Sequence, residues 1–294
     1  MTGNRYILIS PVRNEQDYIV RTVESVVSQT RLPHKWVIVD DGSTDQTAEI
    51  VRNFQATYPW IHLVSLTDRG YYFPGTGVVT VFNAGLETIR NEEWDYVVKL
   101  DVDLSFEPDY FEELLKRFEA DPKLGIASGI TYLPAEGASW KMEAVLDDHP
   151  VGPSKMYRRT CFEAIGGLLP VPGWDLADLL AAQMKGWQTR CWKDLMIKHY
   201  RPTGTRRQGR WARGVLQGRF EYRHGYAPLY TLVKAVYNLI GGANPVWTAG
   251  KIAGYTLAVF KQDPFIFDAP MRSFLRQKQH EHLKQQLFRN THPT

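Results

Sequence analysis

Apolar and polar positions alternate with two different periods along the first two thirds of the chain. Short apolar runs with β-branched residues predict buried strands at 6–10, 36–39, 61–66, 96–100 and 125–133. Between these runs, apolar residues recur at helical spacing in the segments 17–29, 48–54, 78–90 and 110–120. Because strands that alternate with helices favour a parallel sheet with right-handed crossovers, we expect an α/β fold with a mostly parallel open sheet flanked by helices.

The remaining part of the chain predicts helices only. Leu229 to Ile240 contain one apolar helical stripe after Pro228, and a second apolar stretch at 245–260 holds a Gly-x-x-x-Gly pattern that permits close packing. Residues 273–288 form a basic helix candidate. Packing on the preceding domain explains each stretch, and so does attachment of a basic amphipathic set to an anionic membrane. We expect an α/β domain at 1–200 and a basic, mostly helical extension at 201–294.

Composition and charge narrow the class of protein. The 294 residues are 44% hydrophobic and 23% charged, as in an ordinary globular protein. The net charge of +3 conceals an asymmetry, since residues 198–294 hold 16 Lys/Arg and four Asp/Glu and residues 1–197 hold 19 and 28. A basic tail predicts an anionic partner such as a phosphate or a lipid surface. The acidic body and the lack of a recognised nucleic-acid module argue against a nucleic-acid partner.

Cysteine usage and the N-terminus indicate a compartment. Cys161 and Cys191 have neither disulfide-framework nor metal-site spacing, which favours a reducing, cytoplasmic setting. The first residues do not resemble a signal peptide, and no apolar run of about 18 residues predicts a transmembrane helix. We expect a cytoplasmic protein, peripheral on the inner face of the cell membrane if the tail binds lipid. The sequence does not indicate the oligomeric state.

Polar residues follow three of the predicted strands. The first strand leads into Pro11, Val12, Arg13, Asn14 and Glu15, the second into Asp40 and Asp41, and the fourth into Asp101 and Asp103. Open α/β sheets bind ligands at this edge, and carboxylates that leave a buried strand favour a cation. The sequence therefore predicts one site at the carboxyl ends of three strands.

Other interpretations exist for single residues at these ends. An EF-hand loop starting at Asp101 is excluded, because Phe106 stands where that loop needs glycine. An Asx-type turn is the alternative role for Asp41. Ser43 or Thr44 is a candidate cap for the helix that follows.

The order SPVRNE, VDDGSTDQT and KLDVDLSFEPDYFEEL resembles the family 2 glycosyltransferases, which have a GT-A nucleotide-sugar-binding fold. The resemblance covers roughly residues 6–200. It implies transfer of a sugar, with inversion, from a nucleoside-diphosphate donor, most often a UDP-sugar, to an acceptor. It also implies that the loop 11–15 with Asp40 and Asp41 holds the nucleoside, and that Asp101 and Asp103 serve the ribose and a Mg²⁺ or Mn²⁺ diphosphate.

The resemblance continues into the segment GGLLPVPGWDLADLLAAQMKGWQT. Alignment on Gly186-Trp187 puts Asp175 at the family's catalytic Asp, with Trp174 in place of its preceding Glu and Asp178 as the reserve base. A helix N-cap is the alternative role for Asp175. By resemblance, His199 completes the metal shell, although a lone histidine is as often structural.

A dense basic segment, 205–213, resembles the Gln-x-x-Arg-Trp motif of processive polysaccharide synthases. Only one residue separates Gln208 from Arg210, so we expect a non-processive or diverged enzyme. Arg210 is a candidate for binding the donor diphosphate, because arginine forms bidentate contacts with phosphates. A membrane-facing patch is the alternative.

Together these features predict a metal-dependent inverting glycosyltransferase of the hexosyltransferase type, with a saccharide or lipid-linked acceptor, in polysaccharide or glycolipid biosynthesis. The rival is a non-catalytic nucleotide-sugar-binding subunit of a glycan-assembly complex. Trp174, which stands where the family has Glu, motivates that rival.

Overall fold

The computed structural model describes residues 5–68, 75–135, 137, 139–201 and 209–291, with side chains up to residue 285. By its internal contacts the chain divides into two compact units, Met1–Thr203 and Gly204–Thr294. The functional division predicted for 1–200 and 201–294 remains a prediction. Of the basic segment 205–213, the part up to Gln208 lies outside the described residues.

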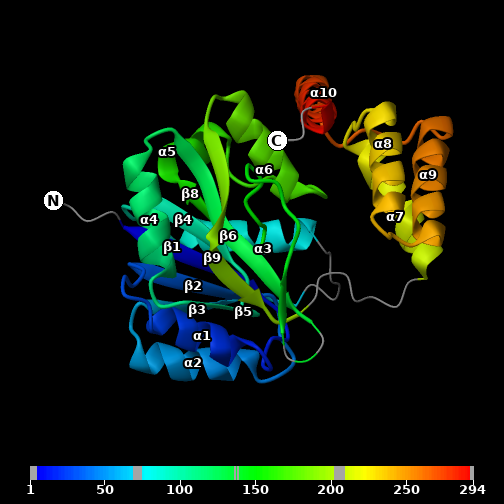
Figure 1. Cartoon of the computed structure of the whole chain (residues 1–294). Helices are drawn as coiled ribbons and strands as arrows, with labels where there is room; N and C mark the ends of the chain where they lie inside the picture. The colour runs from blue at the N-terminus through cyan, green and yellow to red at the C-terminus, as the bar shows by residue number, and fades with distance from the viewer. Residues whose placement is uncertain (1–4, 69–74, 136, 138, 202–208, 292–294) are drawn as a thin grey trace. The chain divides into compact units, whose positions relative to one another are not determined.

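The first unit is built on a nine-stranded sheet in the order β3-β2-β1-β4-β8-β6-β9-β5, with β7 paired to β6 (Figure 1). Strands β1 to β4 are parallel, whereas β8 runs antiparallel to both β4 and β6. The predicted α/β class is therefore confirmed, with an open sheet that is mixed. The strands are β1 Tyr6–Val12, β2 Lys35–Asp40, β3 Ile61–Ser65, β4 Tyr96–Leu100, β5 Leu104–Phe106, β6 Leu124–Pro134, β7 Trp140–Met142, β8 Ser154–Arg158 and β9 Gln188–His199.

Helices cover both faces of this sheet because successive strand residues point to opposite sides. Leu8 and Ile38 face a core that includes residues of α1, α2 and α4, whereas Ile7 and Val37 face residues of α3, α5 and α6. The central strands are thus buried on both faces, which explains why each is a continuous apolar run. The helices are α1 Ile19–Val27, α2 Thr47–Thr57, α3 Thr76–Thr88, α4 Tyr110–Ala120, α5 Arg159–Ala164 and α6 Trp174–Met184.

The predicted cap of α2 is wrong. The helix begins at Thr47 after Gln46, whose side chain makes no capping hydrogen bond, and the Thr47 backbone amide donates to Asp45 Oδ1 (3.0 Å). Ser43 instead accepts a hydrogen bond from the Asn14 amide (2.9 Å). The hydroxyl therefore joins two loops at the sheet edge.

The described part of the second unit is helical, with α7 Arg210–Arg223, α8 Pro228–Ile240, α9 Pro245–Phe260 and α10 Ala269–Thr291. Helices α7 and α9 meet through glycines: a Cβ at Gly218 would lie 1.9 Å from the Lys251 carbonyl oxygen, and one at Gly250 would lie 2.6 Å from that of Trp211. Only glycine permits this approach of two backbones. Within the described residues, no helix is long and apolar enough to cross a membrane.

Candidate active site

The loop after β1 and the loop after β2 form one unit. Arg13 donates to the Asp41 carbonyl (2.5 Å) and pairs with Asp68 (2.8 Å). The Asn14 side chain accepts from the Thr44 amide (2.8 Å), and Asn14 itself has φ 56°, a conformation that asparagine tolerates better than most residues. The predicted segment 11–15 therefore lies directly against Asp41, as a nucleoside-binding wall requires.

Asp40 and Asp41 are both buried at the end of β2, at 4% and 6% exposure. The Asx-type role considered for Asp41 belongs to Asp40, whose side chain accepts from the Ser43 amide (2.9 Å). Gly42 follows with φ 73°, and a Cβ there would lie 2.7 Å from the Asp68 Cα. A glycine is required at this position because any other side chain would push the 66–68 segment away.

Asp101 and Asp103 lie between β4 and β5 and have different partners. Asp101 forms an ion pair with Lys99, with 2.5 Å between Asp101 Oδ1 and Lys99 Nζ, and the Asp101 side chain is 31% exposed. Asp103 is 3% exposed and lies 3.4 Å from His199 Nε2, at the end of β9. The structure thus brings two of the three predicted metal ligands together and turns the third towards a lysine.

Arg201 connects Asp103 to the first loop, a contact that the sequence interpretation missed. Its Nε lies 3.1 Å from Asp103 Oδ2, and its Nη2 lies 2.7 Å from Glu15 Oε1. Arg201 was visible as part of a basic run after the last strand, but its partner Glu15 lies 186 residues earlier. The ends of the first and fourth predicted strands therefore meet, together with the end of β9, in one charged network. The second strand end joins the first loop separately, through the contact of Arg13 with Asp41.

Burial and charge act against each other in this network. Burial acts to raise the pKa of Asp103, but the hydrogen bond from His199 and the charges of His199 and Arg201 outweigh it and hold that pKa below its ordinary value. Burial acts to lower the pKa of His199, and Asp103 outweighs it, so the imidazole pKa is raised. Burial raises the pKa of Glu15 to about 7 although Arg201 opposes the shift.

Three buried polar atoms in the network have no hydrogen-bond partner among the described residues: Asp103 Oδ1, His199 Nδ1 and Glu15 Oε2. Buried polar atoms are rarely left in this state, because each loses its hydration. The described residues contain no group of three or more His, Cys, Asp or Glu arranged to hold a metal. Mg²⁺, however, takes one or two protein carboxylates and completes its shell with substrate phosphates. Asp103, with His199 beside it, fits such a partial site.

The predicted base, Asp175, lies near Gly152, which also contacts Lys99, the partner of Asp101. Gly173, with φ 73°, is the N-cap of α6, so Asp175 is not the cap but the second residue of the helix, and it is exposed. A Cβ at Gly152 would lie 3.7 Å from Asp175 Oδ2, and the Gly152 carbonyl accepts from Lys99 (3.2 Å). Gly152 therefore lies next to both the Lys99 ammonium and the Asp175 carboxylate.

Asp178 is engaged by a different set of residues. Lys155 on β8, fully buried, lies 3.1 Å from both carboxylate oxygens of Asp178, and the Tyr157 hydroxyl donates to Oδ2. Burial raises the pKa of Asp178, and Lys155 and Tyr157 oppose that rise. The Lys155 ammonium also donates to the Asp175 carbonyl (2.8 Å). The sequence interpretation missed β8 and its lysine, which anchor the start of α6.

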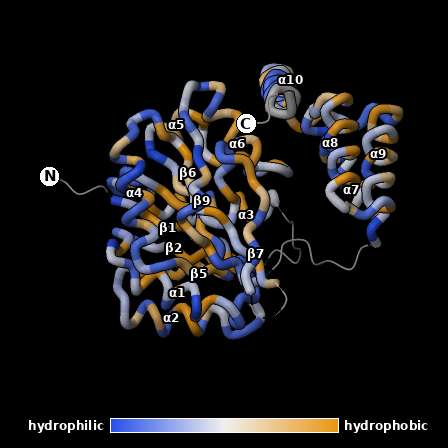
Figure 2. Tube along the Cα trace, viewed as in Figure 1, coloured by the Kyte–Doolittle hydropathy of each residue, from blue (hydrophilic) through white to orange (hydrophobic). Residues whose placement is uncertain are grey.

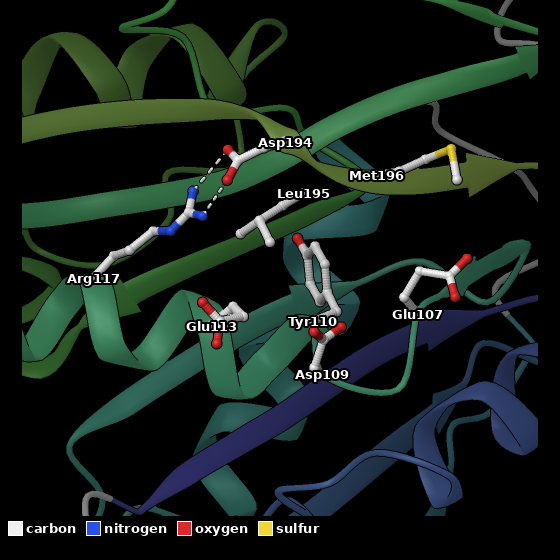
Figure 3. A pocket seen from close by; sticks show the side chains of 8 residues that line it. All are labelled: Glu107, Asp109, Tyr110, Glu113, Arg117, Asp194, Leu195 and Met196. Carbon is white, nitrogen blue, oxygen red and sulfur yellow. Dashed lines mark hydrogen bonds and ion pairs between the residues drawn. The ribbon is translucent and has the colours of Figure 1, made fainter.

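Two further features do not belong to this group of residues. Arg210 is an exposed residue at the start of α7, in the second unit. A pocket on the first unit is lined by α4, β9 and the turn before α4, and it contains none of the predicted site residues (Figure 3). Its one arginine, Arg117, is paired with Asp194 (3.0 Å).

Comparisons with known proteins define the class. The profile of "Glycosyl transferase family 2" matches residues 7–169, more than half of the chain. The chain belongs to this family. The matched stretch contains the three strand ends, while Asp175, Asp178 and His199 lie beyond it.

Named relatives match a shorter stretch. The chain is 33% identical to chondroitin synthase from Escherichia coli over 114 residues, which are 39% of this chain and 15% of that protein. It is 32% identical to hyaluronan synthase from Pasteurella multocida over 124 residues, 41% of this chain and 12% of that protein. The match therefore spans less than a sixth of each of these two relatives.

Solved structures confirm the GT-A fold. The mannosyltransferase PcManGT from Pyrobaculum calidifontis, in complex with GDP-Man and Mn²⁺, superposes with a TM-score of 0.58 at 20% identity, over 96% of this chain and 81% of that one. S. aureus TarS 1-349 in complex with UDP-GlcNAc gives 0.52 at 16% identity, over 73% and 64%.

Proposed function

We propose that the chain is an inverting glycosyltransferase that moves a sugar from a nucleoside-diphosphate donor to a saccharide or lipid-linked acceptor. The observation that supports this proposal is the single charged network in which the β1 loop, the β4–β5 turn and the end of β9 meet at Asp103. The family membership supplies the reaction class. The names of the relatives favour polysaccharide assembly.

In this proposal the loops after β1 and β2 bind the donor. The segment from Pro11 to Glu15 borders the nucleoside together with Asp41. The Asp101 carboxylate, which also pairs with Lys99, accepts hydrogen bonds from the ribose hydroxyls. We favour a UDP-sugar, the donor type bound by TarS, over the GDP-sugar bound by PcManGT. Arg201 is the cation of the first unit that we assign to the diphosphate. The role of Arg210 in diphosphate binding stays a prediction from the sequence.

Asp103 and His199 would hold Mg²⁺ or Mn²⁺. Such a cation supplies charge neutralisation of the diphosphate leaving group. Asp175 is the proposed general base: its exposed carboxylate would accept the proton of the acceptor hydroxyl as that oxygen attacks the anomeric carbon. Asp178 would position α6 through Lys155, since both of its oxygens already accept hydrogen bonds.

The basic extension is the part that we propose to meet an anionic membrane surface on the cytoplasmic side. A lipid-linked or growing glycan acceptor would be presented at such a surface. This placement is independent of the donor chemistry.

Calorimetry with UDP-, GDP- and dTDP-sugars in Mn²⁺, followed by assays of nucleoside-diphosphate release with glycan acceptors, tests the proposal. Asp175→Asn should retain donor affinity and lower turnover by about 10²- to 10⁴-fold. Asp147→Asn, an exposed carboxylate on a loop before β8, is the matched control and should leave both unchanged.

Absence of binding by every nucleoside diphosphate would reject the transferase. Donor binding without turnover in the unmodified chain, with all acceptors tried, would instead favour a non-catalytic subunit. That outcome would fit the buried Trp174, which leaves Asp175 without an adjacent acid.

A further inference from the structure

Helix α8 has its polarity inverted relative to a helix of a water-soluble domain. Its buried residues are Thr231 and Ala235. Its large apolar side chains are exposed, with Ile240 at 82% and Tyr237 at 74%. The same outward set includes Leu229, Leu232, Val233, Val236 and Leu239. Amphipathic helices of globular proteins bury this face and expose the small and polar one.

Helix α9 shows the same inversion. Its buried residues include Thr248, Gly250, Lys251 and Gly254, while Phe260 is 82% exposed. The glycine contact with α7 leaves no room for large side chains at those positions. Tyr255 is buried, but the exposed members of the helix include the large apolar residues Val246, Ile252, Leu257, Val259 and Phe260. Packing through small residues is the way in which helices associate inside membranes. Figure 2 shows hydrophobic colour along α8 and α9 and mostly hydrophilic colour along α10.

The α8–α9 hairpin carries few charges: Lys251 is buried, whereas the Lys234 side chain is 41% exposed. Residues 225–260 contain only two charged residues, Lys234 and Lys251. Both pair with Glu221 on α7, at 3.6 Å and 2.9 Å, and the side chains of Lys251 and Glu221 are 0% and 1% exposed. Burial of an ion pair carries a desolvation penalty. A surface with a single partly exposed charge and many exposed apolar side chains matches an apolar surrounding medium.

The surroundings of the hairpin identify that medium as a lipid bilayer. The exposed Arg210 and Arg213 lie at the start of α7, beside the first turns of α9, because Trp211 contacts Gly250 and Gly214 contacts Trp247. Lys261 follows the last residue of α9. Anionic headgroups complement these cations. A second copy of the chain in a two-fold dimer would instead bring the same cations together. The helices have 13 and 16 residues, about 20 and 24 Å, which is short of a bilayer core of about 30 Å.

We propose that the α8–α9 hairpin is a docking element that inserts its outer face into one leaflet of an anionic bilayer. The contacts that carry this inference all lie in the second unit. It therefore specifies the membrane contact of the proposed function without depending on the transferase chemistry.

Flotation of the full chain with vesicles tests the hairpin directly. Vesicles of phosphatidylcholine with phosphatidylglycerol should bind the chain, and pure phosphatidylcholine should bind it more weakly. Leu232→Asp and Val236→Asp, both at positions 49% exposed, should each lower the partition coefficient about tenfold. High salt should remove the phosphatidylglycerol increment and leave the apolar contribution.

The matched control is Leu32→Asp, on the first unit, where the leucine is 47% exposed. This variant should float like the unmodified chain, and circular dichroism should report unchanged helix content in all three variants. Equal loss in the control, or flotation that is insensitive to the hairpin substitutions, would overturn the proposal. So would the absence of vesicle binding together with a dimer, in light scattering, that the hairpin substitutions dissociate.

Discussion

Two buried carboxylates of the first unit, Asp103 and Asp178, have the same chemistry and nearly the same burial but opposite surroundings. Both oxygens of Asp178 accept hydrogen bonds, from Lys155, Tyr157 and the Leu179 amide. Asp103 keeps one buried oxygen without a partner in the described residues, and atoms of His199 and Glu15 beside it share that condition. A satisfied carboxylate stabilises the fold, whereas an incompletely satisfied one is available to a ligand.

The largest expected effect is on turnover. Asp103→Asn removes the negative charge from the proposed cation site, so kcat/KM should fall by about 10³-fold, and metal-dependent thermal stabilisation by the donor should vanish. The melting temperature without ligands should also fall, because Asn removes the ion pairs with His199 and Arg201, so the metal-dependent shift is measured from the variant's own baseline. Persistence of the metal-dependent shift would contradict the ligand role of Asp103.

The opposite response is expected at Asp178. Asp178→Asn leaves Lys155 buried without a counter-charge and should lower the free energy of unfolding by about 3 to 5 kcal/mol in urea titrations. The double variant Lys155→Met with Asp178→Leu should recover most of this loss, because it removes both charges. A stable Asp178→Asn protein with impaired turnover would make Asp178, not Asp175, the better candidate base.

A substitution of Arg201 should change metal affinity and donor affinity in opposite directions. Arg201→Gln removes the cation that competes with a metal for Asp103 and Glu15, so Mn²⁺ alone should bind at least about threefold more tightly. The donor should bind about tenfold more weakly, because its diphosphate loses the guanidinium. Calorimetry measures both constants, and Arg201→Lys controls for charge. Changes of the same sign in both constants would show that Arg201 acts only on the local structure.

The smallest effect is a pH dependence of stability. Burial raises the pKa of Glu15 from its ordinary value to about 7, so the folded protein binds more protons than the unfolded chain between these values. The contribution of Glu15 to stability should therefore fall as pH rises through this window, by at most about one linked proton, and stay flat above it. Urea titrations of Glu15→Gln across the same pH range should give a flatter profile; an unchanged slope would assign the effect to another group.

The parts of this molecule that could be predicted are those set by local pattern. The β-branched runs predicted β1 to β4 and β6. The strand ends placed Glu15 and Asp103 at one edge of the sheet, because parallel strands share an edge, and Arg201 bridges the two. Strand β8 was missed, since Ser-Lys-Met-Tyr-Arg contains a lysine that only its partner Asp178 makes compatible with burial. Arg201 was missed for a similar reason, because its role depends on contact with Glu15, which lies 186 residues earlier in the sequence.

The apolar stripe of α8 shows a different limit. Its helical spacing was visible in the sequence, but spacing does not say which face of a helix is covered. The inward position of Thr231 follows from its hydrogen bond to Glu221 (3.0 Å), which is a contact between helices. Periodicity therefore located the helix, and tertiary contact decided its orientation.

The glycine contact between α7 and α9 also determines which sequence changes the second unit can accept. At Gly214, Gly218, Gly250 and Gly254, an added Cβ would lie within 2.6 Å of backbone atoms of the opposite helix, so saturation mutagenesis should recover almost no substitutions there. On the outer face of α8, the same library should accept many residues of different shape provided that they are apolar. Sequence change in the second unit would thus be limited by residue size at the glycine contact and only by residue polarity on the outer face of α8.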